Sequence, residues 1–121
     1  MNVPRVRGRD AAMLHIRFQE VRGALVVTPL ARVLDAEVAA DLRDRVREAA
    51  SGRALVVLSL VHVRVLDASA LAALVAIQRR LAPGGELRLA GPAPRVRALL
   101  ALTHLDEVFP TSEDASDVPS A

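Results

Sequence analysis

The pattern of apolar and polar positions near the start of the chain predicts two neighbouring strands. Apolar and polar residues alternate over 14–18, and a period of two is typical of a strand with one buried face. An apolar, β-branched run follows at 24–28, after the turn residues Arg22 and Gly23. This short turn favours an antiparallel hairpin.

From Asp35 onward the spacing of apolar residues changes and predicts a helix. Val38, Leu42 and Val46 recur at helical spacing, while charged residues fill most of the remaining positions. Such a pattern is typical of an amphipathic helix that packs one face against a core. Asp35 suits the N-cap, and Ser51–Gly52 supplies the stop.

The second half of the chain continues this alternation of strands and helices. The continuous apolar run 54–58 predicts a central strand, most simply a parallel one. A second helix is expected from near Ser69 to the Pro83–Gly85 turn, followed by a strand at 86–90 and a third helix at 95–103. The order predicts an α/β domain with a mixed central sheet of four to five strands and helices packed against it.

Composition fits a single domain with its own core. The chain has 121 residues, of which 52% are hydrophobic, and it contains no cysteine. One core can therefore form, whereas disulfides and thiolate metal sites are excluded. No apolar run approaches the ~20 residues of a membrane span, and no signal peptide is recognisable. We expect a cytoplasmic protein that does not insert into the membrane.

The sequence pI of about 10.8 overstates how basic the chain is. Sixteen basic residues, all arginine, oppose 14 acidic ones, so the net charge at pH 7 is only +2. The only aromatic residues are Phe18 and Phe109, which leaves little for stacking on bases. Direct binding of nucleic acid is not expected.

Both ends of the chain lack the apolar spacing that packing requires. We expect a flexible N-terminal arm at 1–11, a domain at 12–110 and a disordered acidic tail at 111–121.

Residues with catalytic or metal-binding chemistry are not arranged for it. His62, Asp67 and Ser69 lie close in sequence, but one short strand-to-helix segment gives no reason for the imidazole to reach the hydroxyl. His15 and His104 lie on other elements without metal-ligand spacing. We expect no catalytic residue, no metal and no cofactor.

The segment Leu55–Leu71 resembles the signature of the STAS domain family, in which an apolar strand and a short loop lead to a serine that opens a helix. Leu34–Asp35–Ala36 is similar to the family's start of its first helix, and 84–92 and 102–110 resemble its later landmarks. The similarity covers most of 13–110 and implies a STAS-like fold of the anti-sigma factor antagonist type.

The resemblance implies that Ser69 is a phosphoacceptor and that the partner is an anti-sigma factor of the serine-kinase ATPase type. The unphosphorylated form would bind this partner and the phosphorylated form would release it. A phosphate near a helix N-terminus is well tolerated by the fold, but it adds about −1.5 to −2 of charge beside Asp67. The residues expected to contact the partner surround Ser69; they are Ser59, Val61, His62, Arg64, Asp67, Ala68, Ala70 and Leu71. An exposed apolar patch is expected over 61–66 and around Ala70 and Leu71.

Three positions depart from the family pattern: Ser59 stands where an aspartate is usual, Ala70 replaces a glycine and Ala68 replaces a serine. Ser69 would also suit a purely structural role as a helix cap. Two other functions therefore stay open: a constitutively bound STAS subunit of a larger assembly, such as a lipid-transport ATPase complex, or a small enzyme of unrecognised type. The oligomeric state is expected to be a monomer or a weak dimer.

Overall fold

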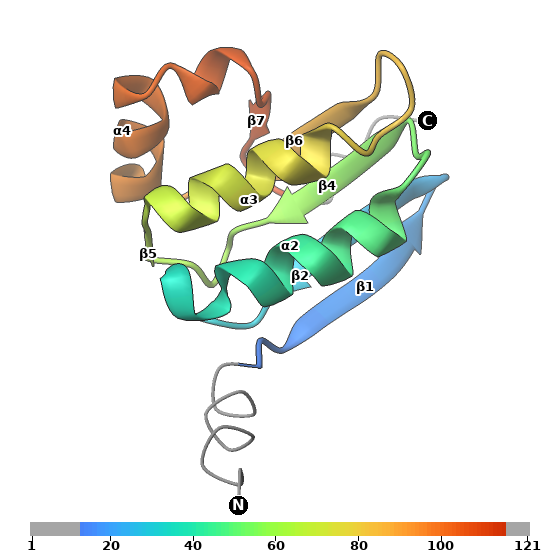
Figure 1. Ribbon diagram of the computed structural model, residues 1–121. Helices are drawn as coiled ribbons and strands as arrows, with labels where there is room; N and C mark the ends of the chain where they lie inside the picture. The colour runs from blue at the N-terminus through green and yellow to red at the C-terminus, as the bar shows by residue number, and fades with distance from the viewer. Residues whose placement is uncertain (1–12, 116–121) are drawn as a thin grey trace, which may run out of the picture.

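The computed structural model describes residues 13–115, which form one layered α/β unit (Figure 1). The elements in chain order are β1 (Ile16–Val21), β2 (Ala24–Pro29), β3 (Val33–Leu34), α2 (Ala36–Ala50), β4 (Leu55–Ser59), β5 (Val65–Leu66), α3 (Ala68–Gln78), β6 (Glu86–Ala90), α4 (Pro94–Leu102), the short 3₁₀ helix η1 (Leu105–Glu107) and β7 (Thr111–Ser112).

Five strands form the main sheet, in the order β1-β2-β4-β6-β7. β1 pairs antiparallel with β2, whereas β2, β4, β6 and β7 are parallel to one another. The two-residue strands β3 and β5 form a separate parallel pair. The mixed sheet predicted from the sequence is confirmed.

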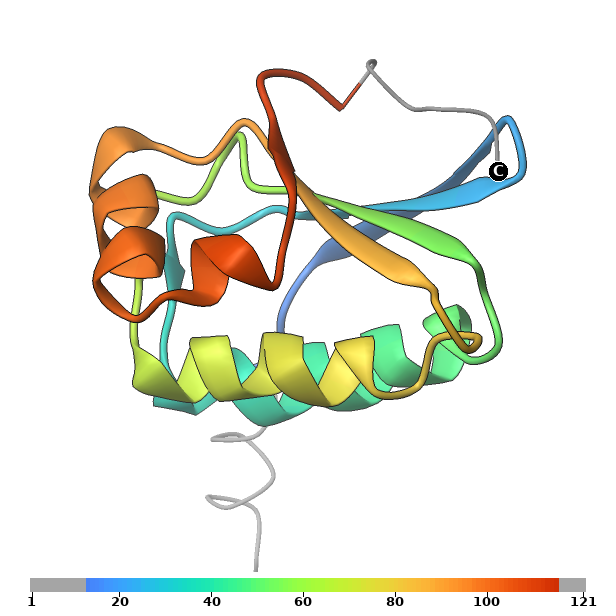
Figure 2. The ribbon, with the colours of Figure 1, turned by 90° about the horizontal axis from the view of Figure 1, so that it is seen from above.

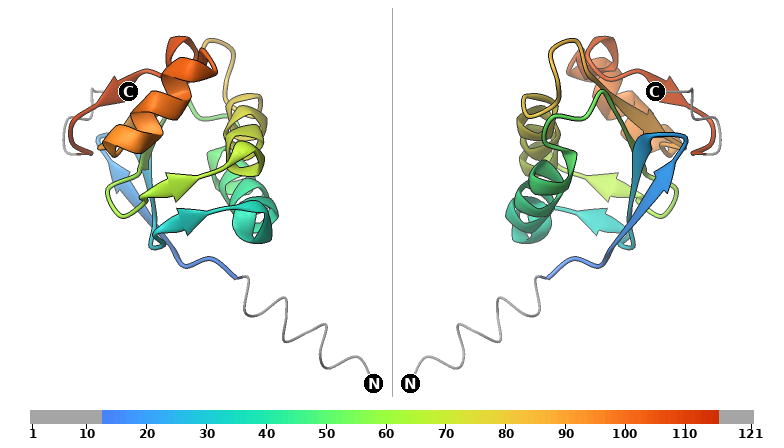
Figure 3. Two further views of the ribbon diagram at one scale, coloured as in Figure 1. Left: turned by 90° about the vertical axis from the view of Figure 1, so that its left-hand side faces the viewer. Right: turned by 90° about the vertical axis from the view of Figure 1, so that its right-hand side faces the viewer.

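The helices α2 and α3 lie side by side along one face of the main sheet (Figure 2). Their buried faces meet the sheet in a core that includes Leu42, Val46, Leu74 and Ile77. α4 contacts β5 and η1, and it lies at the end of the molecule where α3 begins (Figure 3). The starts of α2, α3 and α4 are thus brought to one end of the molecule.

The continuous apolar run in β4 is explained by burial on both faces of the sheet. Val56 and Leu58 belong to the main core, whereas Leu55 and Val57 belong to a smaller cluster. Both sets of side chains are almost inaccessible, which is typical of a central parallel strand.

The predicted boundaries of α2 are confirmed. Asp35 has extended backbone angles, and its carboxylate accepts a hydrogen bond from the Glu37 N–H at 3.1 Å. At the other end, Ser51 is the C-cap and Gly52 has φ +76°, a left-handed conformation that glycine adopts without steric cost.

The structure corrects the predicted boundary of the C-terminal tail. Thr111 and Ser112 form β7, and the Gly91 N–H donates to the Ser112 carbonyl at 2.8 Å. The ordered domain therefore extends past 110. The predicted arm at 1–11 and the rest of the tail at 116–121 lie outside the described residues.

Candidate functional site

Ser69 is the second residue of α3, and Asp67 is the residue that caps this helix. Asp67 has extended backbone angles, and its Oδ1 accepts a hydrogen bond from the Ala70 N–H at 3.1 Å. Aspartate is among the best N-cap residues because its carboxylate satisfies an N–H that the helix leaves free. The structural role considered for Ser69, that of helix cap, is therefore filled by Asp67.

The second carboxylate oxygen of Asp67 reaches the neighbouring helix. Oδ2 accepts a hydrogen bond from the N–H of Ala36, the first residue of α2, at 3.2 Å. The Asp67 N–H donates to the Leu34 carbonyl at 3.1 Å. One side chain thus joins the starts of α2 and α3, the helix ends that carry partial positive charge, and Ser69 lies in the first turn of α3.

Ser69 is exposed, and its hydroxyl forms no hydrogen bond with the described residues. The N–H groups of Ala68 and Ser69 lie in the first turn, where no intrahelical acceptor exists. An exposed nucleophilic oxygen therefore stands at a helix end that favours negative charge.

The segment between β4 and β5 presents part of the predicted contact surface. Val61, His62 and Arg64 are exposed, and Val61 is 62% accessible. Val63 and Leu66, by contrast, are buried in the core. This alternation anchors the segment while leaving three side chains available to a partner.

Three residues predicted to contact a partner are instead buried. Ser59 is 4% accessible at the end of β4, and Ala70 and Leu71 pack into the main core from α3. The expectation of an exposed apolar patch around Ala70 and Leu71 is wrong, because both side chains are buried in the main core. Almost every side chain of α3 is apolar, so the sequence does not mark which face is buried.

Two further exposed apolar residues come from a segment that the sequence analysis did not select. Leu30 and Val33, in the connection from β2 to α2, are 41% and 46% accessible. Leu30, Ala31, Arg32 and His62 line a hollow of about 330 Å³. The available signal was an isolated leucine directly after Pro29, where a strand was expected to end.

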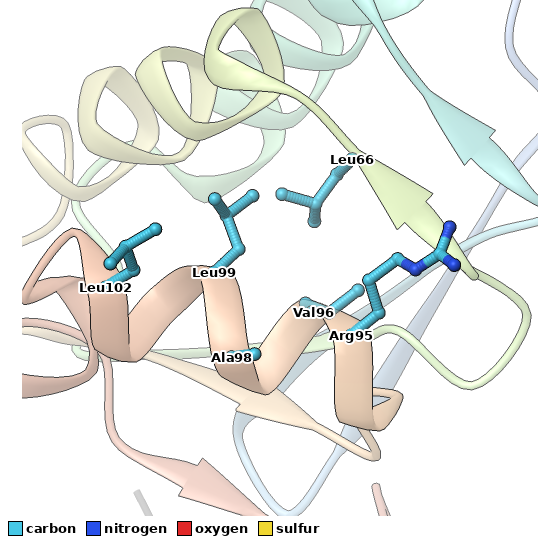
Figure 4. Close-up of a pocket in the computed structure, with 6 residues that line it drawn as sticks. All are labelled: Leu66, Arg95, Val96, Ala98, Leu99 and Leu102. Carbon is cyan, nitrogen blue, oxygen red and sulfur yellow. The ribbon is translucent and has the colours of Figure 1, made fainter.

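A second hollow lies between α4 and β5 (Figure 4). It has a volume of about 330 Å³ and is mostly apolar, with Leu66, Val96, Leu99 and Leu102 in its wall and Arg95 at one end. Leu102 is 78% accessible, so this helix also offers apolar surface.

Within residues 13–115, no group of three or more histidine, cysteine or acidic side chains is placed to hold a metal ion. His104 lies 3.5 Å from Glu107, both at the surface, and is remote in sequence from His62. None of the described helices is long and apolar enough to cross a membrane.

Solved structures share this fold. An anti-sigma factor antagonist from Mycobacterium paratuberculosis is 21% identical, with a TM-score of 0.77 over 88% of this chain and 91% of that one. The phosphorylated form of the Bacillus cell fate determinant SpoIIAA is 17% identical, with a TM-score of 0.63 over 84% and 95%. A sulfate transporter family protein from Wolinella succinogenes is 19% identical, with a TM-score of 0.65 over 81% and 83%.

No curated protein matches the sequence. The STAS domain family model, however, matches residues 15–118, which include every strand of the main sheet and the helices α2, α3 and α4. With this match and the observed sheet order, the chain belongs to the STAS domain family.

Proposed function

We propose that this protein is an anti-sigma factor antagonist, that it binds a serine-kinase-type anti-sigma factor through the surface around Ser69, and that phosphorylation of Ser69 releases this partner. Structures of anti-sigma factor antagonists, among them SpoIIAA, which is also known in its phosphorylated form, are similar to it in fold. Its role is binding, and no residue of its own is assigned to catalysis.

The observation that carries the proposal is that Asp67, and not Ser69, caps α3. Because Asp67 supplies the capping hydrogen bond, the Ser69 hydroxyl is not needed to cap the helix, and Ser69 is exposed. A kinase can therefore approach it without unfolding the helix. In the transfer, Oγ attacks the γ-phosphorus of ATP, ADP leaves, and the hydroxyl proton passes to a base of the kinase.

Phosphorylation changes the surface far more than it changes the fold. The starts of α2 and α3 stabilise negative charge at this end of the domain. A partner that covers Ser69 meets about −1.5 to −2 of new charge, which it must desolvate without a matching cation. Loss of binding then follows from electrostatics at the interface, with little rearrangement of the domain.

The contact surface has a polar centre and an apolar border. Ala68 and Ser69 are exposed at the start of α3, and Val61, His62 and Arg64 are exposed before β5. Leu30 and Val33 supply further apolar area that a partner can cover. Interfaces of this kind combine a desolvated apolar part with polar groups that fix the register.

The test uses the full chain with its anti-sigma factor and ATP. Ser69→Asp should weaken binding by about tenfold or more, which corresponds to roughly 1.4 kcal/mol, whereas Ser69→Ala should bind like the wild type and take up no phosphate. Ser51→Asp is the matched control, because Ser51 lies at the other end of α2. Equal binding by the Ser69 variants, with no phosphate on Ser69 by mass spectrometry, would refute the switch.

The second candidate function is a constitutively bound STAS subunit of a larger assembly, such as a lipid-transport ATPase complex. The similarity in fold to a sulfate transporter family protein favours it, as does Ser59 in place of the family's usual aspartate. This function requires that the partner co-purify in a fixed ratio and that ATP leave the complex intact.

A further inference from the structure

Three arginines from three separate segments line one pocket near the start of α4. Arg32 precedes β3, Arg64 precedes β5, and Arg95 lies in the first turn of α4. The remaining wall is formed by Val65, Ala93 and Pro94, and the volume is about 420 Å³. We call this hollow the arginine pocket.

The backbone fixes two of these arginines beside each other. The Arg32 carbonyl accepts hydrogen bonds from the N–H groups of Arg64 at 2.7 Å and Val65 at 3.1 Å. These bonds begin the parallel pairing of β3 with β5. Arg95 joins them because α4 packs against β5, and its side chain extends from α4 toward that strand (Figure 4).

No described residue neutralises the charge of the arginine pocket. None of its three arginines forms an ion pair within residues 13–115, whereas Arg45 pairs with Asp41 and Arg97 with Glu113. No acidic residue lines the pocket. Like charges held together cost free energy in the folded state, and a bound anion removes that cost.

We infer that the arginine pocket binds a small phosphate-class anion with two or more negative charges. Guanidinium groups form paired, charge-assisted hydrogen bonds with phosphate oxygens, and three of them match the charge of a pyrophosphate group. The volume falls within the range of small-molecule sites. Arginines drawn from three segments around one hollow suit a compact ligand better than an extended acidic peptide.

The arginine pocket shares Arg64 with the proposed contact surface but does not include the proposed phosphorylation site itself. Ser69 does not line the arginine pocket, and α4 takes no part in capping α3. Either proposal can therefore fail while the other stands. A small anion at this position would add a second input to the domain, independent of kinase activity.

The probe is inorganic pyrophosphate, titrated into the ¹⁵N-labelled full chain and followed by amide chemical shifts. We expect saturable shifts at Arg64, Val65 and Arg95, with a dissociation constant that rises as NaCl is added. Arg64→Gln and Arg95→Gln should each weaken binding about tenfold, as loss of a charge-assisted hydrogen bond predicts. Arg64→Lys keeps the positive charge but loses the paired N–H donors of the guanidinium group, so it should weaken pyrophosphate binding less than Arg64→Gln does.

The matched control is Arg80→Gln, which removes the same charge from the exposed turn after α3. It should leave the dissociation constant unchanged. Shifts spread over all exposed arginines, or an equal loss in Arg80→Gln, would refute a built site. Tighter binding of a phosphoserine or glutamate-rich peptide than of pyrophosphate would refute the small-molecule ligand.

Discussion

Asp67 accepts a hydrogen bond from the backbone N–H of Ala36 at 3.2 Å, although the two residues are 31 positions apart in the chain. The same carboxylate caps its own helix through the Ala70 N–H. Asp67 therefore links the starts of two helices, one of which carries Ser69.

Replacing Asp67 should cost more stability than replacing an ordinary cap. Asp67→Ala removes two hydrogen bonds and should lower the free energy of unfolding by about 1–3 kcal/mol, measured by urea denaturation. Asp35→Ala is the comparison, because among residues 13–115 the Asp35 carboxylate accepts a hydrogen bond from the Glu37 N–H alone. This substitution should cost about 1 kcal/mol. An equal loss in both variants would show that the bond to Ala36 contributes nothing.

Ser69→Ala should not destabilise the domain. Because Asp67 supplies the cap, the substitution removes no capping bond, and the higher helix propensity of alanine should raise the free energy of unfolding by a few tenths of a kcal/mol, ~0.5 at most. This differs from the sequence-based reading of Ser69 as a cap, which requires a loss of about 1 kcal/mol. Urea denaturation of the two forms decides between them.

His104→Gly should stabilise the protein. His104 follows α4 with φ +61°, a left-handed conformation that costs a side-chain-bearing residue roughly 1 kcal/mol and that glycine adopts freely. The melting temperature should rise in His104→Gly. His104→Ala keeps the steric cost and is the control; a similar rise in both variants would mean that the imidazole, and not the backbone, is unfavourable.

The ion pair between Glu20 and Arg53 should make stability depend on pH in the acid range. The hydrogen bond from Arg53 lowers the pKa of the Glu20 carboxyl below its ordinary value of 4.5. Since the folded-state pKa is the lower one, the contribution is fully present above pH 4.5 and disappears as the pH falls through the folded-state pKa.

The comparison for this pair is Glu20→Gln. At neutral pH the variant should unfold at lower urea concentration than the wild type, and the difference should vanish in acid. Both partners are near the surface, so added salt should also reduce the difference. A difference that is constant from neutral pH down to acid would exclude the ion pair as its cause.

The sequence by itself determined the elements that are long enough to show a period. α2 and its Asp35 cap, the doubly buried β4, and β6 at 86–90 appear where the apolar pattern predicts them. The hairpin also forms, but β1 spans Ile16–Val21 instead of 14–18, and Phe18, expected on its buried face, is exposed. Each of these elements buries one or both of its faces, and this burial produces a periodic or continuous run of apolar residues that can be recognised in the sequence.

Only the tertiary structure showed which residues of distant elements contact one another. The pair β3 and β5 is two residues long in each strand, too short to show any period, yet it places Arg32 beside Arg64 and Asp67 beside Ala36. Almost every side chain of α3 is apolar, so its sequence provided little indication that Ala70 and Leu71 are buried in the core. Hydrogen bonds and charges between distant segments depend on chain topology, which local patterns do not encode.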